Sequence, residues 1–157
     1  TRRYILTIRD RLTRGFIAGL IAGIPMNILS YIFFTLGFTE LRFVDWVYIL
    51  LLERMVQPTI SSHAFALITH LMFTGILGII FAYFIKSVST ENYYFKGWLF
   101  SVTVWFLSYL GSTLFPVFKF IITSVKTPAT NLVSATVFGL VLAWALKWLD
   151  HSVKVNS

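Results

Sequence analysis

The sequence predicts an all-α, polytopic membrane four-helix bundle. Only 12% of its 157 residues are charged and 57% are hydrophobic, whereas a soluble domain carries roughly 25% charged residues. Four apolar segments reach the roughly 20 residues that a helix needs to cross a bilayer. They contain no Asp, Glu or Arg, and they cover residues 16–36, 63–85, 97–115 and 129–149. We therefore expect one integral membrane domain over residues 1–157, without a soluble catalytic domain.

Residues 2–14 precede the first apolar segment. In "TRRYILTIRDRLTR" a helix would place Tyr4, Ile5, Ile8 and Leu12 on one face and the arginines on the other. This pattern is typical of an interfacial helix on the inner leaflet, and a cytoplasmic extension of the first span is the alternative. The span is too long for the apolar part of a signal peptide, and no small-residue cleavage site follows it. We expect it to be retained.

The segment 16–36 begins beside a double GxxxG motif, with glycines at positions 15, 19 and 23. Small residues let helix backbones approach closely in lipid, where burial of apolar surface cannot drive association. Rows with the same spacing occur in 63–85 and 129–149, so we expect tight helix crossings. Whether the first row packs inside the bundle or on a second subunit is open, and we favour the inside. The predicted packing residues are Gly15, Gly19, Gly23, Gly78, Ala135, Gly139 and Ala143.

Two further residues of this segment weaken a regular helix. Pro25 cannot donate to the carbonyl one turn back, near Ile21, and this predicts a kink. Asn27 lies two residues farther on and could donate a hydrogen bond to another helix. We expect this structural role for Asn27.

Residues 42–57, "RFVDWVYILLLERMVQ", are apolar but too charged and too short to span a bilayer. They predict an interfacial or re-entrant helix at the outer surface, with Trp46 and Tyr48 at headgroup level. Pro58 ends the segment.

An internal repeat relates the two halves of the chain. "LSYIFFTL" at 29–36 parallels "LSYLGSTL" at 107–114, and "GIIFAYFIK" at 78–86 parallels "GLVLAWALK" at 139–147. The matches keep their order, so the first two spans correspond to the last two. Because both pairs start on the same side, we expect a parallel repeat about an axis along the membrane normal.

The basic residues predict the orientation. With four spans, nine of the 13 Lys and Arg residues lie on the side of the two termini, which the positive-inside rule assigns to the cytoplasm. The net charge of +7 then suits anionic lipid at the cytoplasmic face, so no nucleic acid is needed as a partner. We expect a multi-pass protein of the bacterial cytoplasmic membrane. The nine are Arg2, Arg3, Arg9, Arg11, Arg14, Lys86, Lys96, Lys147 and Lys154.

His70 is the one ionisable side chain deep inside a predicted span, and such groups mark functional sites. At ~1.5 Å per residue it lies roughly 24 Å from the basic residue that ends its span, as does Asn131 in its own span. Such a histidine could relay protons, bond a quinone carbonyl or ligate a metal. It could equally be a neutral ring bonded to Asn131, Asn27 or a carbonyl. The candidate polar cluster is Asn27, Ser30, His70, Ser108, Ser112 and Asn131.

Other chemistry is disfavoured. The chain has no cysteine, and His63 is about 10 Å along the helix from His70, too far to share a metal. We expect no metal and no cofactor. The carboxylates do not converge, and no phosphate-binding loop or nucleophile elbow occurs. A Ser108–His70 dyad has only similar depth in its favour, so we expect no enzyme.

Two stretches resemble a known family. "GFTELRFVDWV" after the glycine-rich span and "KGWLFSVTVWFLSYLGSTLFPVFK" are similar to the YqhR-like group of small bacterial membrane proteins, which have four helices. The likeness touches most of the chain and departs at "TPATNLVSATVFG". The resemblance implies a fold and no activity.

The expected function is that of a non-catalytic membrane subunit, an accessory or assembly component of a larger membrane protein complex. Its expected partners are membrane lipids and other membrane subunits. One alternative is a small transporter or channel that uses the cluster around His70. Another is a quinone- or lipid-binding subunit of a redox complex.

Overall fold

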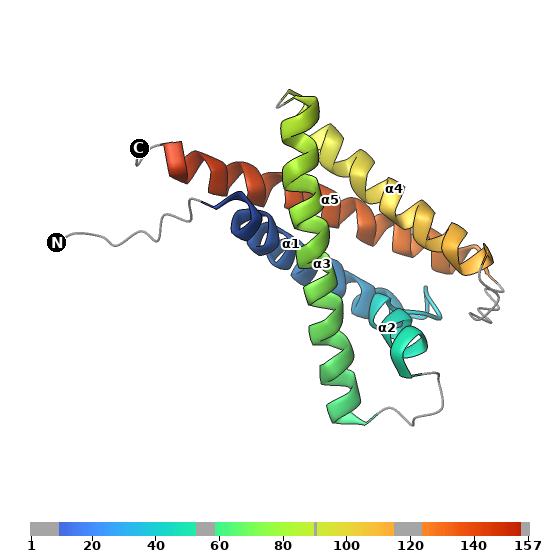
Figure 1. Ribbon diagram of the computed structural model, residues 1–157. Coiled ribbons are helices and arrows are strands. Elements are labelled where there is room, and N and C mark those ends of the chain that lie inside the picture. Colours follow the sequence, from blue (N-terminus) through green and yellow to red (C-terminus); the bar gives the residue numbers. More distant parts are fainter. Residues whose placement is uncertain (1–9, 53–58, 90, 115–123, 155–157) are drawn as a thin grey trace.

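The protein is all-α, as predicted, in a computed structural model that describes residues 10–52, 59–89, 91–114 and 124–154 (Figure 1). No strand occurs in these residues. The helices are α1 (Arg11–Thr35), α2 (Phe43–Leu52), α3 (Ile60–Val88), α4 (Tyr93–Leu114) and α5 (Lys126–Lys154).

Three of the described helices are long and apolar enough to cross a membrane: α1, α3 and, over Lys126–His151, α5. The predicted span at 97–115 corresponds to α4, whose 22 residues are also long enough. The described residues therefore support a membrane protein with three such spans.

Side-chain caps determine where α1 and α3 begin. The Asp10 carboxylate accepts hydrogen bonds from the Thr13 hydroxyl and backbone N–H, both at 2.7 Å, and these bonds hold the pKa of Asp10 below its usual value. Thr59 and Ser62 form a reciprocal capping box at the start of α3. At the other end of α1, Gly37 turns the chain with a positive φ of 73°.

The long helices pack in the order α3, α1, α5, α4. α3 runs across α1, α1 packs on α5, and α4 lies alongside α5 (Figure 1). α3 and α4, at the two ends of this order, touch only lightly. Aromatic rings fill the space between them near the α3–α4 turn, where Phe81 lies 6.0 Å from Tyr93 and 5.3 Å from Phe100. Farther from this turn, α3 and α4 diverge (Figure 1).

The glycine row of α1 packs inside the protein, against α3. A Cβ atom added to Gly15 would lie 2.8 Å from the Gly78 carbonyl oxygen, and one added to Gly19 would overlap the Thr74 carbonyl. A Cβ on Gly78 would in turn overlap the backbone of Gly15 and Gly19. We call this backbone approach the first glycine contact.

A second glycine contact joins α4 and α5. A Cβ added to Gly97 would overlap the Gly139 carbonyl, and it would lie 2.7 Å from the Ala143 Cβ. A Cβ on Gly139 would overlap Ser101 and the Gly97 carbonyl. Ala135, the remaining small residue of the α5 row, is buried. The small residues Gly139 and Ala143 of α5 thus pack on α4, whereas the glycines of α1 pack on the small residues of α3.

The two glycine contacts can be compared with the predicted repeat. Gly78 and Gly139 occupy matching places in the sequence repeat, and each meets a glycine carbonyl of the preceding long helix. Gly97 takes the place of Gly15 in this comparison, whereas the matched letters of the repeat pair Gly97 with Gly19. The packing of α4 is therefore one helical turn out of step with the sequence match.

One ion pair ties α1 to the end of α5. Arg14 Nε lies 2.9 Å from a carboxylate oxygen of Asp150, with 9% of the arginine side chain and 27% of the aspartate side chain exposed. Arg11 also donates from Nη1 to the Ala82 carbonyl, at 3.0 Å. Residues 11–14, predicted as part of an interfacial helix 2–14, belong to α1, and Tyr4, Ile5 and Ile8 lie outside the described residues.

α1 continues as one α-helix through Pro25, and the kink stays a prediction. Val44, Val47 and Tyr48 of α2 are buried beside Ala66 of α3. The interfacial or re-entrant placement of α2 in a membrane stays a prediction. The end of the predicted segment 42–57 lies outside the described residues. α2 fits into the fold because its apolar face covers the part of α3 that diverges from α4.

Candidate functional site

A cavity of about 400 Å³ lies between α2, α3 and α4, where α3 and α4 diverge. This volume is in the range of small-molecule sites, roughly 300–1,000 Å³. Aromatic and aliphatic side chains dominate the lining, and none of the described lining residues is charged. They are Phe43, Trp46, Val47, Leu50, Leu51, Thr69, His70, Phe73, Trp105, Leu107, Ser108, Tyr109 and Gly111.

His70 is the polar residue that stands out in this lining. Only 6% of its surface is exposed, and its Nδ1 atom is enclosed without a hydrogen-bond partner in the described chain. The Phe43 ring stacks on the imidazole, with centroids 5.7 Å apart and planes 16° apart. The expected bond from His70 to Asn131, Asn27 or a carbonyl is absent among the described residues, since Asn131 bonds Tyr109 and Asn27 bonds Gly23 of its own helix.

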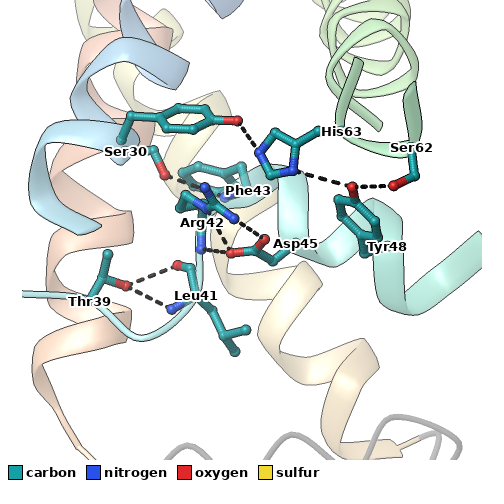
Figure 2. Close-up of polar contacts among 10 residues, drawn as sticks. Ser30, Thr39, Leu41, Arg42, Phe43, Asp45, Tyr48, Ser62 and His63 are labelled. Carbon is teal, nitrogen blue, oxygen red and sulfur yellow. Dashed lines mark hydrogen bonds and ion pairs between the residues drawn. The ribbon is translucent and has the colours of Figure 1, made fainter. Parts of the chain in front are cut away.

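Hydrogen bonds at the start and in the middle of α2 fix its position (Figure 2). At the start, Arg42 donates to Asp45 from its backbone N–H at 2.7 Å, from Nε at 3.0 Å and from Nη2 at 2.8 Å. Farther along, the Tyr48 hydroxyl lies 2.9 Å from Ser62 Oγ and 3.2 Å from His63 Nδ1. These contacts hold Phe43 and Trp46 of α2 at the cavity.

A second set of contacts ties α2 and α3 to α1. The Tyr31 hydroxyl lies 2.8 Å from His63 Nε2, so both nitrogens of His63 have tyrosine partners. The Arg42 guanidinium lies 4.9 Å from the centroid of the Tyr31 ring and 4.4 Å from that of Phe34. Burial alone would lower the pKa of Arg42. The hydrogen bonds and the charge of Asp45 outweigh this effect, so the pKa is raised above its usual value and the guanidinium stays charged.

The opposite side of the cavity belongs to α4. Tyr109 lies between two tryptophan rings, 5.5 Å from Trp46 and 5.3 Å from Trp105. Its hydroxyl oxygen accepts a hydrogen bond from Asn131 Nδ2 of α5 at 3.0 Å. Asn131, 1% exposed, thus lies behind the cavity and orients a side chain that lines it.

The predicted polar cluster is only partly assembled. Asn27 and Ser30 are buried in α1, and Ser30 Oγ accepts from the Phe43 backbone N–H at 3.4 Å. Asn27 does not donate to another helix as expected: its Nδ2 donates to Gly23 of its own helix, at 2.8 Å, and its Oδ1 has no partner in the described chain. Asn27 is buried in α1, and the Gly23 carbonyl, four residues earlier in the same helix, is the acceptor that its amide reaches.

The α4 serines of the predicted polar cluster do not bond to its other members in the described residues. Ser108 lines the cavity but is exposed, and it donates to the Val104 carbonyl at 2.8 Å. It forms no dyad with His70. Ser112 belongs to α4, and its side chain lies outside the described residues.

Sequence reasoning missed the aromatic residues of the cavity and the Tyr31–His63–Tyr48 contacts. One signal was present, because Trp105 and Tyr109 are one turn apart and therefore share a helix face. The polar contacts had no comparable signal, since Tyr31, Tyr48 and His63 come from three different helices.

Neither a metal-ligand cluster nor a similar protein indicates the chemistry of this cavity. No group of three or more His, Cys, Asp or Glu side chains in the described residues could hold a metal ion. Comparison with protein-family models, with curated proteins and with solved structures gives no match for this chain.

Proposed function

We propose that this protein is an integral membrane protein that binds a lipid-soluble small molecule in the cavity between α2, α3 and α4. The observation that carries the proposal is the cavity itself, an apolar space of about 400 Å³ that has the almost fully buried His70 in its lining. The imidazole gives this apolar lining a hydrogen-bonding group that a bound molecule can engage.

The exposed border of the cavity supports entry from lipid. Leu50 of α2, Phe73 of α3 and Leu107 of α4 line the cavity, and each is about half exposed. In a bilayer such side chains contact acyl chains. The same border argues against the transporter alternative, because a water-filled path needs polar groups along it.

The membrane placement belongs to the proposal. With α4 as a fourth span and both termini cytoplasmic, as the basic residues favour, the cavity lies in the outer half of the membrane beneath α2. The YqhR-like resemblance and its bacterial cytoplasmic membrane stay predictions that agree with this placement.

The test is to isolate the protein in nanodiscs directly from its own membranes and to identify extracted small molecules by mass spectrometry. Gly111 lines the cavity, and a Cβ added there meets no atom within 4 Å. Gly111→Phe should therefore fill the cavity without disturbing the fold. Thr103→Phe is the matched control, because Thr103 is exposed on the same helix and does not line the cavity.

We expect a near-stoichiometric molecule with the unaltered protein and with Thr103→Phe, and its loss from Gly111→Phe. A molecule that stays bound to Gly111→Phe would lie elsewhere, and the proposal would be wrong. Recovery of nothing beyond bulk membrane lipid from the unaltered protein would also contradict it.

A role as an accessory subunit is the second candidate. Trp144 and Trp148 of α5 are exposed and stacked, with ring centroids 6.3 Å apart and planes 7° apart, and Leu140 continues their face. Paired tryptophans on a helix suit a partner helix. Native mass spectrometry of the gently extracted protein should then show other subunits in a fixed ratio, and isolation as a single chain or a homo-oligomer would exclude this role.

A further inference from the structure

The cavity has no means to hold a charged group. No lysine, arginine, aspartate or glutamate is among its described lining residues, and the nearby Arg42 is engaged by Asp45. Burial of an unpaired ion costs several kcal/mol even after the protein relaxes. A phospholipid headgroup or a fatty-acid carboxylate is therefore disfavoured in this cavity, and a neutral head is favoured.

The side chains around the cavity suit a flat molecule. Phe43 lies parallel to the imidazole of His70, and Trp46, Trp105 and Tyr109 form a second aromatic group on the α2 and α4 sides. Aromatic side chains gain roughly 0.5–1.5 kcal/mol beyond area burial when rings stack or meet edge to face. A planar ring uses such surroundings better than a flexible alkyl chain does.

The two halves of the protein differ at one matched pair of polar residues. When the glycine contacts are matched, Gly15 with Gly97 and Gly78 with Gly139, Tyr109 corresponds to Asn27 and Asn131 to His70. In the second half the pair is hydrogen-bonded. In the first half, His70 Nδ1 and Asn27 Oδ1 both lack partners within the described chain. The matched polar residues are therefore hydrogen-bonded to each other in the second half and not in the first.

His70 can form a hydrogen bond with either a carbonyl or a hydroxyl oxygen of a ligand. A neutral imidazole has one donor nitrogen and one acceptor nitrogen. Nδ1 is enclosed by the protein and His70 lines the cavity, so we infer that Nε2 is the nitrogen that meets a ligand. A ligand carbonyl can accept from Nε2, and a ligand hydroxyl can donate to it.

We propose that the cavity binds a neutral amphiphile whose flat ring carries a carbonyl or hydroxyl oxygen, with that oxygen on His70. The apolar chain of the ligand leaves between α3 and α4, past Phe73 and Leu107. This inference rests on the proposed function, because it specifies the chemistry of the molecule that the cavity takes.

The experiment uses the full chain in nanodiscs and titrates decylubiquinone, a ring with carbonyl oxygens and a ten-carbon chain, while tryptophan fluorescence is followed. Trp46 and Trp105 at the cavity should be quenched. Two competitors separate the features of the probe. Decanol has the chain without the ring, and phosphatidylglycerol has a charged head. We expect each to bind at least about tenfold more weakly than decylubiquinone, which corresponds to roughly 1.4 kcal/mol.

Three variants locate the binding. His70→Leu should weaken binding about tenfold, and His70→Gln, which keeps a hydrogen-bonding group, should stay within about threefold of the unaltered protein. His151→Leu is the control, since His151 is exposed and does not line the cavity. Thermal unfolding shows which variants are folded. The comparison of decylubiquinone with decanol and phosphatidylglycerol uses the unaltered protein, so it does not depend on the folding of any variant.

If decanol competes as well as decylubiquinone, the preference for a flat ring is wrong. If phosphatidylglycerol does so, the preference for a neutral head is wrong. Unchanged binding by folded His70→Leu would show that His70 does not bind the ligand. In these cases the cavity still takes a lipid-soluble molecule, and the proposed function stands. The proposed function fails on its own test, when no molecule is recovered from the unaltered protein or when the recovered molecule stays bound to Gly111→Phe.

Discussion

The α1–α3 pair and the α4–α5 pair share a close glycine contact but differ in the polar residues two turns away from it. In α4–α5, Asn131 bonds Tyr109 two turns from Gly139. In α1–α3 the corresponding His70 is unbonded to Asn27, and α2 packs beside it. Each pair contributes one helix to the cavity, α3 from the first and α4 from the second. Two helix pairs with a similar backbone contact can thus differ in whether their buried polar groups bond to each other.

The largest expected effect tests whether the two glycine contacts carry equal weight. Gly78→Ala and Gly139→Ala each place a Cβ into backbone atoms of the partner helix. Overlap with backbone cannot be relieved by a rotamer change, so we expect each to cost about 3 kcal/mol or more. Unfolding in mixed detergent micelles measures this cost. Sensitivity at one site alone would show that the two contacts are not equivalent.

The second prediction concerns the link between the halves. Arg14→Met leaves Asp150 near a helix end without its closest cation. Removal of one partner of a fully buried pair costs roughly 3–5 kcal/mol, and the partial exposure of Asp150 reduces this to about 2 kcal/mol. The double variant Arg14→Met/Asp150→Leu should recover most of the loss in the same unfolding measurement. A double variant as unstable as the single one would assign the effect to packing.

A third experiment contrasts the matched polar pair directly, with ligand-free protein. Asn131→Leu removes a bond between helices and should lower stability by about 1 kcal/mol. His70→Leu removes an enclosed nitrogen that has no partner, so stability should stay level or rise by about 1 kcal/mol. Midpoints of thermal unfolding give both values. A clear loss of stability in His70→Leu would mean that the imidazole has a structural role, contrary to the comparison of the halves.

The smallest effect comes from a glycine outside both contacts. Gly111 lies in α4, where an added Cβ meets nothing within 4 Å. Gly111→Ala should stabilise the helix by about 0.5 kcal/mol, because alanine has the better helix propensity. It is the matched control for Gly139→Ala, since both replace a helical glycine with the same residue. A large loss at Gly111 would mean that an added methyl group destabilises these helices without a close contact, and the losses at Gly78 and Gly139 could then not be assigned to the glycine contacts.

Much of the fold followed from local features of the sequence. The apolar segments predicted helices within a few residues of α1, α3, α4 and α5, because the length needed to cross lipid and the flanking charges are properties of the chain alone. The spacing of Gly15 and Gly19 predicted a close crossing. It did not identify the partner, since α3 and α5 both carry small-residue rows with that spacing.

The candidate site was predictable only in part. Counting residues placed His70 and Asn131 at the same depth, and both are buried. Depth does not say which way a side chain points around its helix, so Ser108 and Asn27 were grouped with His70 although neither bonds to it. The contribution of Phe43 and Trp46 from α2 was out of reach, because it depends on how a short helix docks against two longer ones.

The sequence by itself determined that this chain is helical and suited to a membrane, where glycine rows allow close packing and a histidine is costly to bury. These properties depend on composition and on spacing along one helix. Only the tertiary structure decided that α1 packs on α3, that α4 pairs with α5 one turn out of step with the repeat, and that α3 and α4 diverge over a cavity. Such choices depend on contacts between helices distant in sequence, where several pairings satisfy the same small-residue pattern and side-chain shape selects among them.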